Sequence, residues 1–251
     1  PPRSTLFPYT TLFRSDLTVA LSGKVDRVDG YIKNGRLYLR VMDYKSGKKS
    51  FSLSDIWYGL NMQLIIYLYA LQQEGLDRYR QRLEAELNEI VPAGVLYVPV
   101  RDELPDAPRD IDEDALRAMR DKALRRSGLL SDDMELLEAM EHGLEGDGRF
   151  IPVTIKTQKG EDELTLAAKS AVADLAKFGR LARYTHEKLL EMGRELRGGS
   201  VTADPCKKDK NSSYCDWCEF RAACRFDETA GDKARWLRHL SDEDFWQQVG
   251  G

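Results

Sequence analysis

The chain has 251 residues, of which 42% are hydrophobic and 32% are charged, and its mean hydropathy is −0.51. A chain of this length can bury a sizeable core as one large domain. No apolar run approaches the ~20 residues that a membrane helix needs, so we expect no membrane-spanning segment. The net charge of −4 argues against a uniformly basic nucleic-acid-binding protein. A local basic groove is compatible with it, because phosphate binding depends on where the charges lie.

The first fifteen residues are set apart by their sequence. Residues 5–15 read TLFPYTTLFRS, which resembles the translation of a sequencing-adaptor oligonucleotide. We therefore interpret residues 1–15 as non-native and leave them out of the predicted fold; the alternative is a natural, strand-like N-terminus. We expect the natural sequence to begin near Asp16 and the chain to be the C-terminal part of a longer protein. No basic segment followed by an apolar one is present, so we expect a cytoplasmic protein.

Two neighbouring segments predict a β-hairpin. Residues 17–33 and 36–45 have the alternation and the composition of strands. Between them lies Asn34-Gly35, and Asn-Gly is the strongest short-range signal for a two-residue type I′ turn. The two segments are therefore expected to pair as antiparallel strands.

The rest of the chain predicts an alternation of helices and strands. An N-cap region at 52–55 predicts a helix that runs to about Gln73, and residues 93–100 predict a buried strand. Further along, 150–155 is a candidate strand and 164–196 predicts one long helix or two. The expected organisation is a core over 16–100, a helical insertion over 101–149, core helices over 150–200, a cysteine region over 201–227 and a C-terminal tail over 228–251.

The hairpin turn fixes which side chains face one another. With Asn34 and Gly35 as the turn residues, Asp26 lies opposite Asp43, and opposed residues point to the same face. Lys45 lies two residues beyond Asp43, so the pleat turns it to that face as well. Asp29 falls on the other face, opposite Arg40, and we assign it a structural role. A register slip of one residue would turn every one of these side chains to the wrong face.

This arrangement has the chemistry of a metal-dependent hydrolase. Two opposed carboxylates repel each other unless a cation neutralises them, and Mg²⁺ typically takes one or two carboxylates together with phosphate and water. A neighbouring lysine can orient a water molecule or stabilise charge on a phosphate. Asp26, Asp43 and Lys45 therefore predict a phosphodiester hydrolysis site. The alternative is a surface salt bridge between Lys45 and the aspartates at the end of a hairpin.

Three motifs together resemble the RecB-like PD-(D/E)XK nuclease superfamily: GKVDRVD at 23–29, VMDYKSG at 41–47 and QLIIY at 63–67. The resemblance implies an α/β fold, in which a restriction-endonuclease-like mixed sheet is flanked by helices. It also implies a deoxyribonuclease that uses one or two Mg²⁺ or Mn²⁺ ions.

The same resemblance assigns roles to individual residues. It implies that Asp26, Asp43 and the backbone carbonyl of Tyr44 bind the metal and that Lys45 assists the attacking water. Gln63 and Tyr67, spaced i,i+4 on one helix face, correspond to a supporting motif beside the active site. Their spacing alone is that of ordinary helix residues.

Four cysteines follow the predicted core with the spacing C-x8-C-x2-C-x5-C, at Cys206, Cys215, Cys218 and Cys224. CxxC is a chelating spacing, and thiolates bind either Zn²⁺ or iron–sulfur clusters. From the residues alone, four thiolates predict a tetrahedral zinc site. Free or disulfide-forming thiols are the remaining alternative.

The segment YCDWCEFRAACRFD at 214–227 resembles the cluster motif of AddB-type helicase–nuclease subunits. The resemblance implies a 4Fe–4S cluster held by Cys215, Cys218 and Cys224 and by a cysteine far upstream; Cys206 is the candidate substitute for that fourth ligand. It also implies DNA and an AddA-like helicase–nuclease subunit as partners, in the processing of double-strand breaks for recombinational repair. The family carries a further acidic or histidine residue on a helix before the first strand. No such helix precedes Asp16 in this sequence, which puts activity of the chain by itself in doubt.

Two rival functions follow from the same residues. One is a stand-alone RecB-like exonuclease with an iron–sulfur cluster, and the other is a non-catalytic DNA-binding module. The presence of Asp26, Asp43 and Lys45 together counts against the second. The sequence has no GxxxxGK[ST] phosphate loop and so no ATPase signature of its own.

Overall fold

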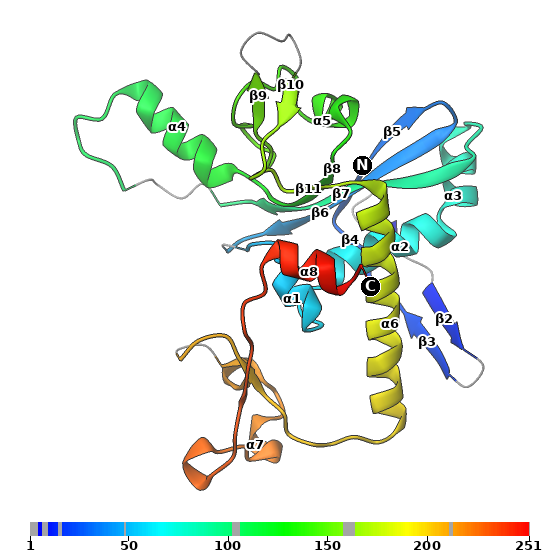
Figure 1. Cartoon of the computed structure of the whole chain (residues 1–251), viewed down its shortest axis with the longest axis vertical. Coiled ribbons are helices and arrows are strands. Elements are labelled where there is room, and N and C mark those ends of the chain that lie inside the picture. The colour runs from blue at the N-terminus through cyan, green and yellow to red at the C-terminus, as the bar shows by residue number, and fades with distance from the viewer. Residues whose placement is uncertain are drawn as a thin grey trace.

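A five-stranded mixed sheet organises the computed structural model, which describes residues 5–6, 10–14, 17–47, 49–101, 106–157, 164–210 and 213–250. Its strand order is β11-β8-β7-β6-β5 (Figure 1). Strands β5 and β6 are antiparallel, β6 and β7 parallel, β7 and β8 antiparallel, and β8 and β11 parallel. The predicted α/β fold with a mixed sheet is therefore confirmed. The strands span Arg27–Lys33 (β5), Arg36–Lys45 (β6), Glu89–Pro99 (β7), Ser127–Ser131 (β8) and Val172–Ala173 (β11).

Strand β6 divides the core into two layers, because successive side chains point to opposite faces. Leu37, Leu39 and Val41 belong to the core that includes residues of α2 (Gln63–Glu74) and α6 (Leu175–Arg197). Met42 belongs to the other core, with residues of β8 and of α5 (Met134–Met140). Figure 1 shows α2 and α6 on one side of the sheet and α5 on the other. By this alternation Asp43 faces the α2 side.

The predicted hairpin register is confirmed over the seven residues of β5, whereas the predicted pair of Asp26 with Asp43 lies beyond the ladder. Asn34 and Gly35 have φ values of 51° and 71°, as a type I′ turn requires, and the pairs run from Lys33 with Arg36 to Arg27 with Met42. The strand expected over 17–33 is broken, however, into β3 (Leu17–Leu21), β4 (Lys24–Val25) and β5.

Gly23 lies in the interruption between β3 and β4. A Cβ at this position would lie 2.6 Å from Cε1 of Tyr67, so the Tyr67 ring occupies the space of a side chain. Asp26 then lies in a bend between β4 and β5. The pairing of β5 with β6 therefore ends at Arg27, the residue that follows Asp26 in the chain.

The single helix expected up to Gln73 is two helices, α1 (Leu53–Trp57) and α2, followed by α3 (Leu76–Leu83). The interval between α1 and α2 contains Gly59 and Asn61, whose φ values of 77° and 55° are left-handed. Glycine and asparagine adopt this conformation most readily, and it ends a right-handed helix. The break turns α1 into a separate element beside the edge of the sheet.

The helical insertion predicted over 101–149 is wrong in one respect. The two expected helices are present as α4 (Glu113–Leu124) and α5, but β8 lies between them and pairs with β7 inside the central sheet. A Cβ at Gly128 would lie 1.9 Å from the carbonyl oxygen of Val95. Glycine is therefore what lets β8 approach β7 so closely, and the segment contributes to the core.

The segment after the insertion is more extended than expected. Strand β9 (Ile155–Thr157) pairs with β10 (Leu164–Leu166), and β11 follows, so the helix predicted from residue 164 begins only at Leu175. The carboxylate of Asp174 accepts a hydrogen bond of 2.6 Å from the backbone N–H of Lys177 and caps this helix. The candidate strand over 150–155 overlaps β9 only at its last residue.

Near the N-terminus, β1 (Thr5–Leu6) pairs with β4, and β2 (Thr10–Arg14) pairs with β3. These are separate two-stranded sheets outside the central one. Pairing does not test the predicted foreign origin of residues 1–15. Within the described ranges, no helix combines the length and the apolar character that crossing a membrane requires.

The cysteine region lies apart from the central sheet (Figure 1). Its entry and exit form a parallel pair, β12 (Cys206–Lys207) with β13 (Arg235–Trp236). Between them lie η1 (Tyr214–Trp217), α7 (Arg221–Cys224) and η2 (Glu228–Ala230).

The C-terminal tail predicted over 228–251 is not a tail. Residues 242–248 form helix α8 (Asp242–Gln248), which packs beside α1 and α6 (Figure 1). Phe245 is fully buried, and its ring makes edge contacts with Trp57 and Tyr184, at centroid distances of 6.4 and 5.9 Å. The sequence did not predict this packing, because the aromatic residues of α8 stand isolated in a polar segment.

We predict that Phe245→Ala lowers the free energy of unfolding by about 3–5 kcal/mol, because it leaves a cavity among aromatic rings. Urea unfolding followed by circular dichroism measures the change. The control is Leu196→Ala at a side chain that is 80% exposed, where we expect a change within about 0.5 kcal/mol. Equal stability of Phe245→Ala and the wild type would show that α8 does not support the core.

Candidate active site

Asp43 occupies a buried position near the end of β6. The residue is 6% exposed, and Nζ of Lys45 lies 2.5 Å from its Oδ2. This oxygen has no partner of hydrogen-bond geometry among the described residues. Buried carboxylate oxygens are normally satisfied by donors or by a cation. Lys45 is the charged group that contacts this oxygen, and a carboxylate can accept further ligands beside it.

Asp26 lies next to this group, but not in the manner of a ladder pair. The paired residues end at Arg27 and Met42, and Oδ2 of Asp26 instead accepts a hydrogen bond of 2.9 Å from the backbone N–H of Tyr44. This bond holds the Asp26 carboxylate beside the Asp43–Lys45 segment. The structure thus brings Asp26, Asp43 and Lys45 to the same end of the hairpin.

Asp29 occupies the position that the register predicts, opposite Arg40. Its carboxylate receives hydrogen bonds of 2.6 Å from Arg40 and 2.7 Å from Arg27. Burial acts to raise the pKa of Asp29, but the two guanidinium groups outweigh it and hold the pKa below the ordinary 3.8. Asp29 serves to neutralise the buried Arg40, as the sequence indicated.

Tyr97 is a part of the site that sequence analysis missed. It lies beside Asp43 on the parallel strand β7 and is 3% exposed. Burial, aided by the negative charges of Asp43 and Asp55, raises the pKa of Tyr97 to about 12. The ammonium groups of Lys45 and Lys49 lie 5.8 and 5.9 Å from the centre of its ring. Tyr97 is therefore a neutral aromatic wall to which two cations are attracted.

Gln63 and Tyr67 lie in the first turns of α2, as predicted, and Nε2 of Gln63 donates a hydrogen bond of 3.0 Å to the Tyr67 hydroxyl. The Tyr67 ring packs against Gly23, three residues before Asp26. Both side chains line a cavity of about 340 Å³ together with Gly23. This pair contacts the segment that leads into Asp26, which agrees in place with a supporting role.

The donor set at this end of the hairpin fits a hard divalent cation. Mg²⁺ prefers oxygen ligands and commonly takes one or two carboxylates, with phosphate and water completing its shell. Asp26 and Asp43 supply two carboxylates at this end of the hairpin, and Lys45 contacts one of them. In the described part of the chain, no three His, Cys, Asp or Glu side chains gather into a metal-holding group, so any further ligands would come from elsewhere. The Tyr44 carbonyl stays a prediction.

The four cysteines do not form one ligand group in this structure. All four are free thiols, on β12 (Cys206), on η1 (Cys215), just after η1 (Cys218) and at the end of α7 (Cys224). No three of them come together as a metal site within the described ranges. The predicted cluster ligands therefore stay a prediction, and no chemical step at the active site is derived from them.

The fold and the Asp43-x-Lys45 site define a class of nuclease. A family model of the PD-(D/E)XK nuclease superfamily matches residues 3–225, and the chain belongs to this superfamily. The chain is 33% identical over 243 residues to the B subunit of the ATP-dependent helicase/deoxyribonuclease of Clostridium botulinum (strain Loch Maree / Type A3), covering 96% of this chain and 20% of that protein.

The corresponding B subunit from Ruminiclostridium cellulolyticum (strain ATCC 35319 / DSM 5812 / JCM 6584 / H10) is 34% identical over 230 residues, with 91% of this chain and 19% of the relative covered. The resemblance inferred from the motifs is thus confirmed. The chain spans about one fifth of the length of these curated relatives.

We predict that Asp29→Asn lowers the free energy of unfolding at neutral pH by about 1–3 kcal/mol, because it weakens the hydrogen bonds to a buried guanidinium. The lowered pKa of Asp29 means that its stabilisation is present above pH 3.8 and is lost as the pH falls further. Urea unfolding at several pH values should therefore show the wild type and the variant converging in acid.

The matched control is Asp77→Asn, which alters an exposed i,i+3 pair with Arg80 and should change stability by less than about 0.5 kcal/mol. A constant difference between wild type and Asp29→Asn down to the most acid pH would contradict the assignment.

Proposed function

We propose that this chain is the nuclease module of a helicase–nuclease and that it hydrolyses DNA phosphodiester bonds with Mg²⁺ or Mn²⁺. The observation that carries the proposal is the buried Asp43 carboxylate, which contacts Lys45 at the end of the hairpin that also holds Asp26. Membership of the PD-(D/E)XK nuclease superfamily supports it.

Each residue of the site has a distinct task under this proposal. Asp26 and Asp43, with the Tyr44 carbonyl, would hold the cation, which when bound neutralises phosphate charge and acidifies water. Lys45 carries a positive charge at the same place, so it can donate a hydrogen bond to the attacking water or to a phosphate oxygen. The hydrogen bond from the backbone N–H of Tyr44 holds the Asp26 carboxylate at the end of the hairpin. Gln63 and Tyr67 support the segment before Asp26.

The setting of the module is also proposed. The relatives are named as B subunits of an ATP-dependent helicase/deoxyribonuclease, which supports DNA as the substrate and a second, AddA-like helicase–nuclease subunit as the partner. We place the activity in the cytoplasm, as an exonuclease in the processing of double-strand breaks for recombinational repair.

We predict that Asp43→Ala lowers Mg²⁺-dependent cleavage of linear DNA by at least about 10²-fold, since it removes both a proposed metal ligand and the partner of Lys45. Chelation of the metal should abolish wild-type cleavage. The assay follows release of nucleotides from an end-labelled duplex, with the chain alone and within a full-length helicase–nuclease that contains it.

Asp29→Asn is the matched control, because it alters a neighbouring aspartate that pairs with Arg40; its cleavage rate should stay at the wild-type level. Equal cleavage by Asp43→Ala and the wild type would overturn the proposed site. DNA binding without cleavage in the full-length context would favour a non-catalytic DNA-binding module.

We further propose that the cysteine region holds a 4Fe–4S cluster through Cys215, Cys218 and Cys224, with Cys206 as the candidate fourth ligand. The chelating CxxC spacing supports a thiolate-bound metal. In this structure Cys215 and Cys218 flank one short turn, where Cys218 N–H donates to the Cys215 carbonyl at 3.3 Å. That turn is compatible with two thiolates approaching one metal.

Anaerobic purification should then give a brown protein that contains iron and acid-labile sulfide, and Cys218→Ala should lose both. Cys206→Ser tests the fourth ligand. If Cys206 binds the cluster, this variant should lose the brown colour in the same way as Cys218→Ala. A colourless wild-type protein with one equivalent of zinc would contradict the cluster and establish the zinc alternative.

A further inference from the structure

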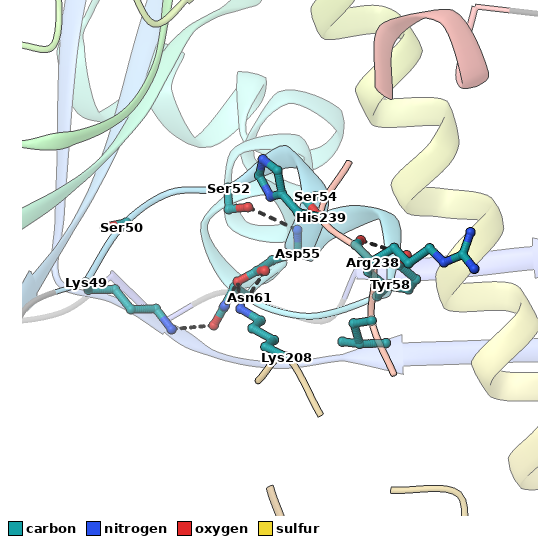
Figure 2. A pocket seen from close by; sticks show the side chains of 11 residues that line it. Lys49, Ser50, Ser52, Ser54, Asp55, Tyr58, Asn61, Lys208, Arg238 and His239 are labelled. Atoms are coloured by element: carbon teal, nitrogen blue, oxygen red, sulfur yellow. Dashed lines mark hydrogen bonds and ion pairs between the residues drawn. The ribbon is translucent and has the colours of Figure 1, made fainter. Parts of the chain in front are cut away.

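A second polar pocket, of about 400 Å³, lies between α1 and the two segments that flank the cysteine region (Figure 2). We name it the junction pocket. Its wall includes Lys49 and residues of α1 from one side of the sequence, and Lys208 and residues 237–239 from the other. The segments that meet here are therefore about 150 positions apart in the chain, as the contact between Asp55 and Lys208 shows.

One buried carboxylate organises this pocket. Asp55 is 8% exposed, and Nζ of Lys208 lies 2.6 Å from it. Nδ2 of Asn61 donates a hydrogen bond of 2.6 Å to Asp55, and Lys49 donates one to Oδ1 of Asn61 (Figure 2). Asp55 and Asn61 thus hold two ammonium groups on the same wall.

The charges of the pocket do not cancel. Asp55 compensates one positive charge at most, whereas Lys49 and Lys208 contribute two. The Arg238 guanidinium points away from these groups (Figure 2). Burial lowers the pKa of Lys49, although Asp55 acts in the opposite direction. An anion in the pocket would relieve this cost of desolvating an ammonium group. The pocket is therefore suited to a negatively charged ligand.

The pocket is also close to the candidate active site. Lys49 and Lys45 lie 5.9 and 5.8 Å from the centre of the same Tyr97 ring. A DNA strand carries one phosphate for about every 3.4 Å of helix axis. A strand whose phosphate reaches Asp43 and Lys45 therefore has a further phosphate within reach of the pocket a few nucleotides away.

We propose that the junction pocket binds a backbone phosphate of the DNA strand a few nucleotides from the bond that is cut. Lys49 and Lys208 are the phosphate-binding cations, and Asp55 and Asn61 are positioning residues that set their placement. This inference rests on the proposed nuclease function.

Lys208 could instead serve to connect α1 to the cysteine region, through its ion pair with Asp55. Two other contacts already provide this connection: the Tyr58 hydroxyl donates to the Arg238 carbonyl at 2.9 Å, and Leu240 N–H donates to the Ser54 hydroxyl at 3.0 Å. The charge of Lys208 is thus not the only link across the junction. Its removal should leave the pocket in place.

The test measures binding of a single-stranded oligonucleotide in a chelating buffer, where no cleavage occurs, over a range of salt concentrations. Each lost phosphate contact should reduce the slope of log K against log salt by about 0.7. We expect this reduction for Lys49→Ala and for Lys208→Ala, whatever the DNA sequence. Lys49→Arg and Lys208→Arg keep the positive charge and should therefore keep the wild-type slope. The control, Lys122→Ala on the exposed surface of α4, should keep the wild-type slope.

Asp55→Asn separates phosphate binding from a structural role. It removes the neutralising charge, but the amide oxygen of the new side chain can still accept a hydrogen bond from Lys208 and keep it in place. We therefore expect DNA binding at least as tight as in the wild type. A purely structural network predicts weaker binding, as in Lys208→Ala. Circular dichroism and thermal unfolding establish that each variant is folded before its slope is compared.

The outcomes distinguish this proposal from the proposed function. Wild-type slopes in both lysine-to-alanine variants, with cleavage that still depends on Asp43, would overturn the junction pocket and leave the nuclease assignment standing. Absence of DNA binding by the folded wild-type chain would overturn the junction pocket, whereas the cleavage assay in the full-length helicase–nuclease tests the nuclease assignment separately.

Discussion

The structure depends on one electrostatic constraint: the Asp43 carboxylate lies in the interior of the protein, where Lys45 is the cation in contact with it. Asp43 is buried at the end of β6, and Lys45 is its charged contact. Burial of a carboxylate is costly unless it is paired and hydrogen-bonded, and Lys45 supplies the pairing charge. A bound divalent cation would add a second positive charge beside the buried carboxylate, so the burial of Asp43 and the proposed chemistry are linked.

The surrounding elements hold the Asp43 carboxylate in place. The Asn34-Gly35 turn sets the hairpin, which carries Asp26 to the end of β6, where it accepts the N–H of Tyr44. The parallel strand β7 contributes Tyr97 as a neutral wall. Since sheets are rigid compared with loops, charges are fixed before any substrate arrives, which is what electrostatic preorganisation requires.

The sequence predicted the parts of the site that depend on local rules. A two-residue turn and a period of two determine the register, and they predicted that Asp26, Asp43 and Lys45 lie at one end of the hairpin. The expected pairing of Asp26 with Asp43 is not part of the ladder, because Asp26 lies in a bend and accepts the N–H of Tyr44. The sequence did not predict β8, because a strand of five residues between charged helices shows too little periodicity. The role of Tyr97 was not predicted either, because this residue lies within an apolar run. The junction pocket could not be predicted, because Asp55 and Lys208 meet only through the tertiary fold.

The most direct test of the account is Mn²⁺ binding, measured by electron paramagnetic resonance as the metal is titrated into the wild type, Asp43→Asn and Asp29→Asn. We expect saturable binding by the wild type and by Asp29→Asn. We expect its loss in Asp43→Asn, whose side chain has nearly the same shape without the charge. Binding of equal affinity in the wild type and in Asp43→Asn would contradict the claim that the buried carboxylate is the centre of the site.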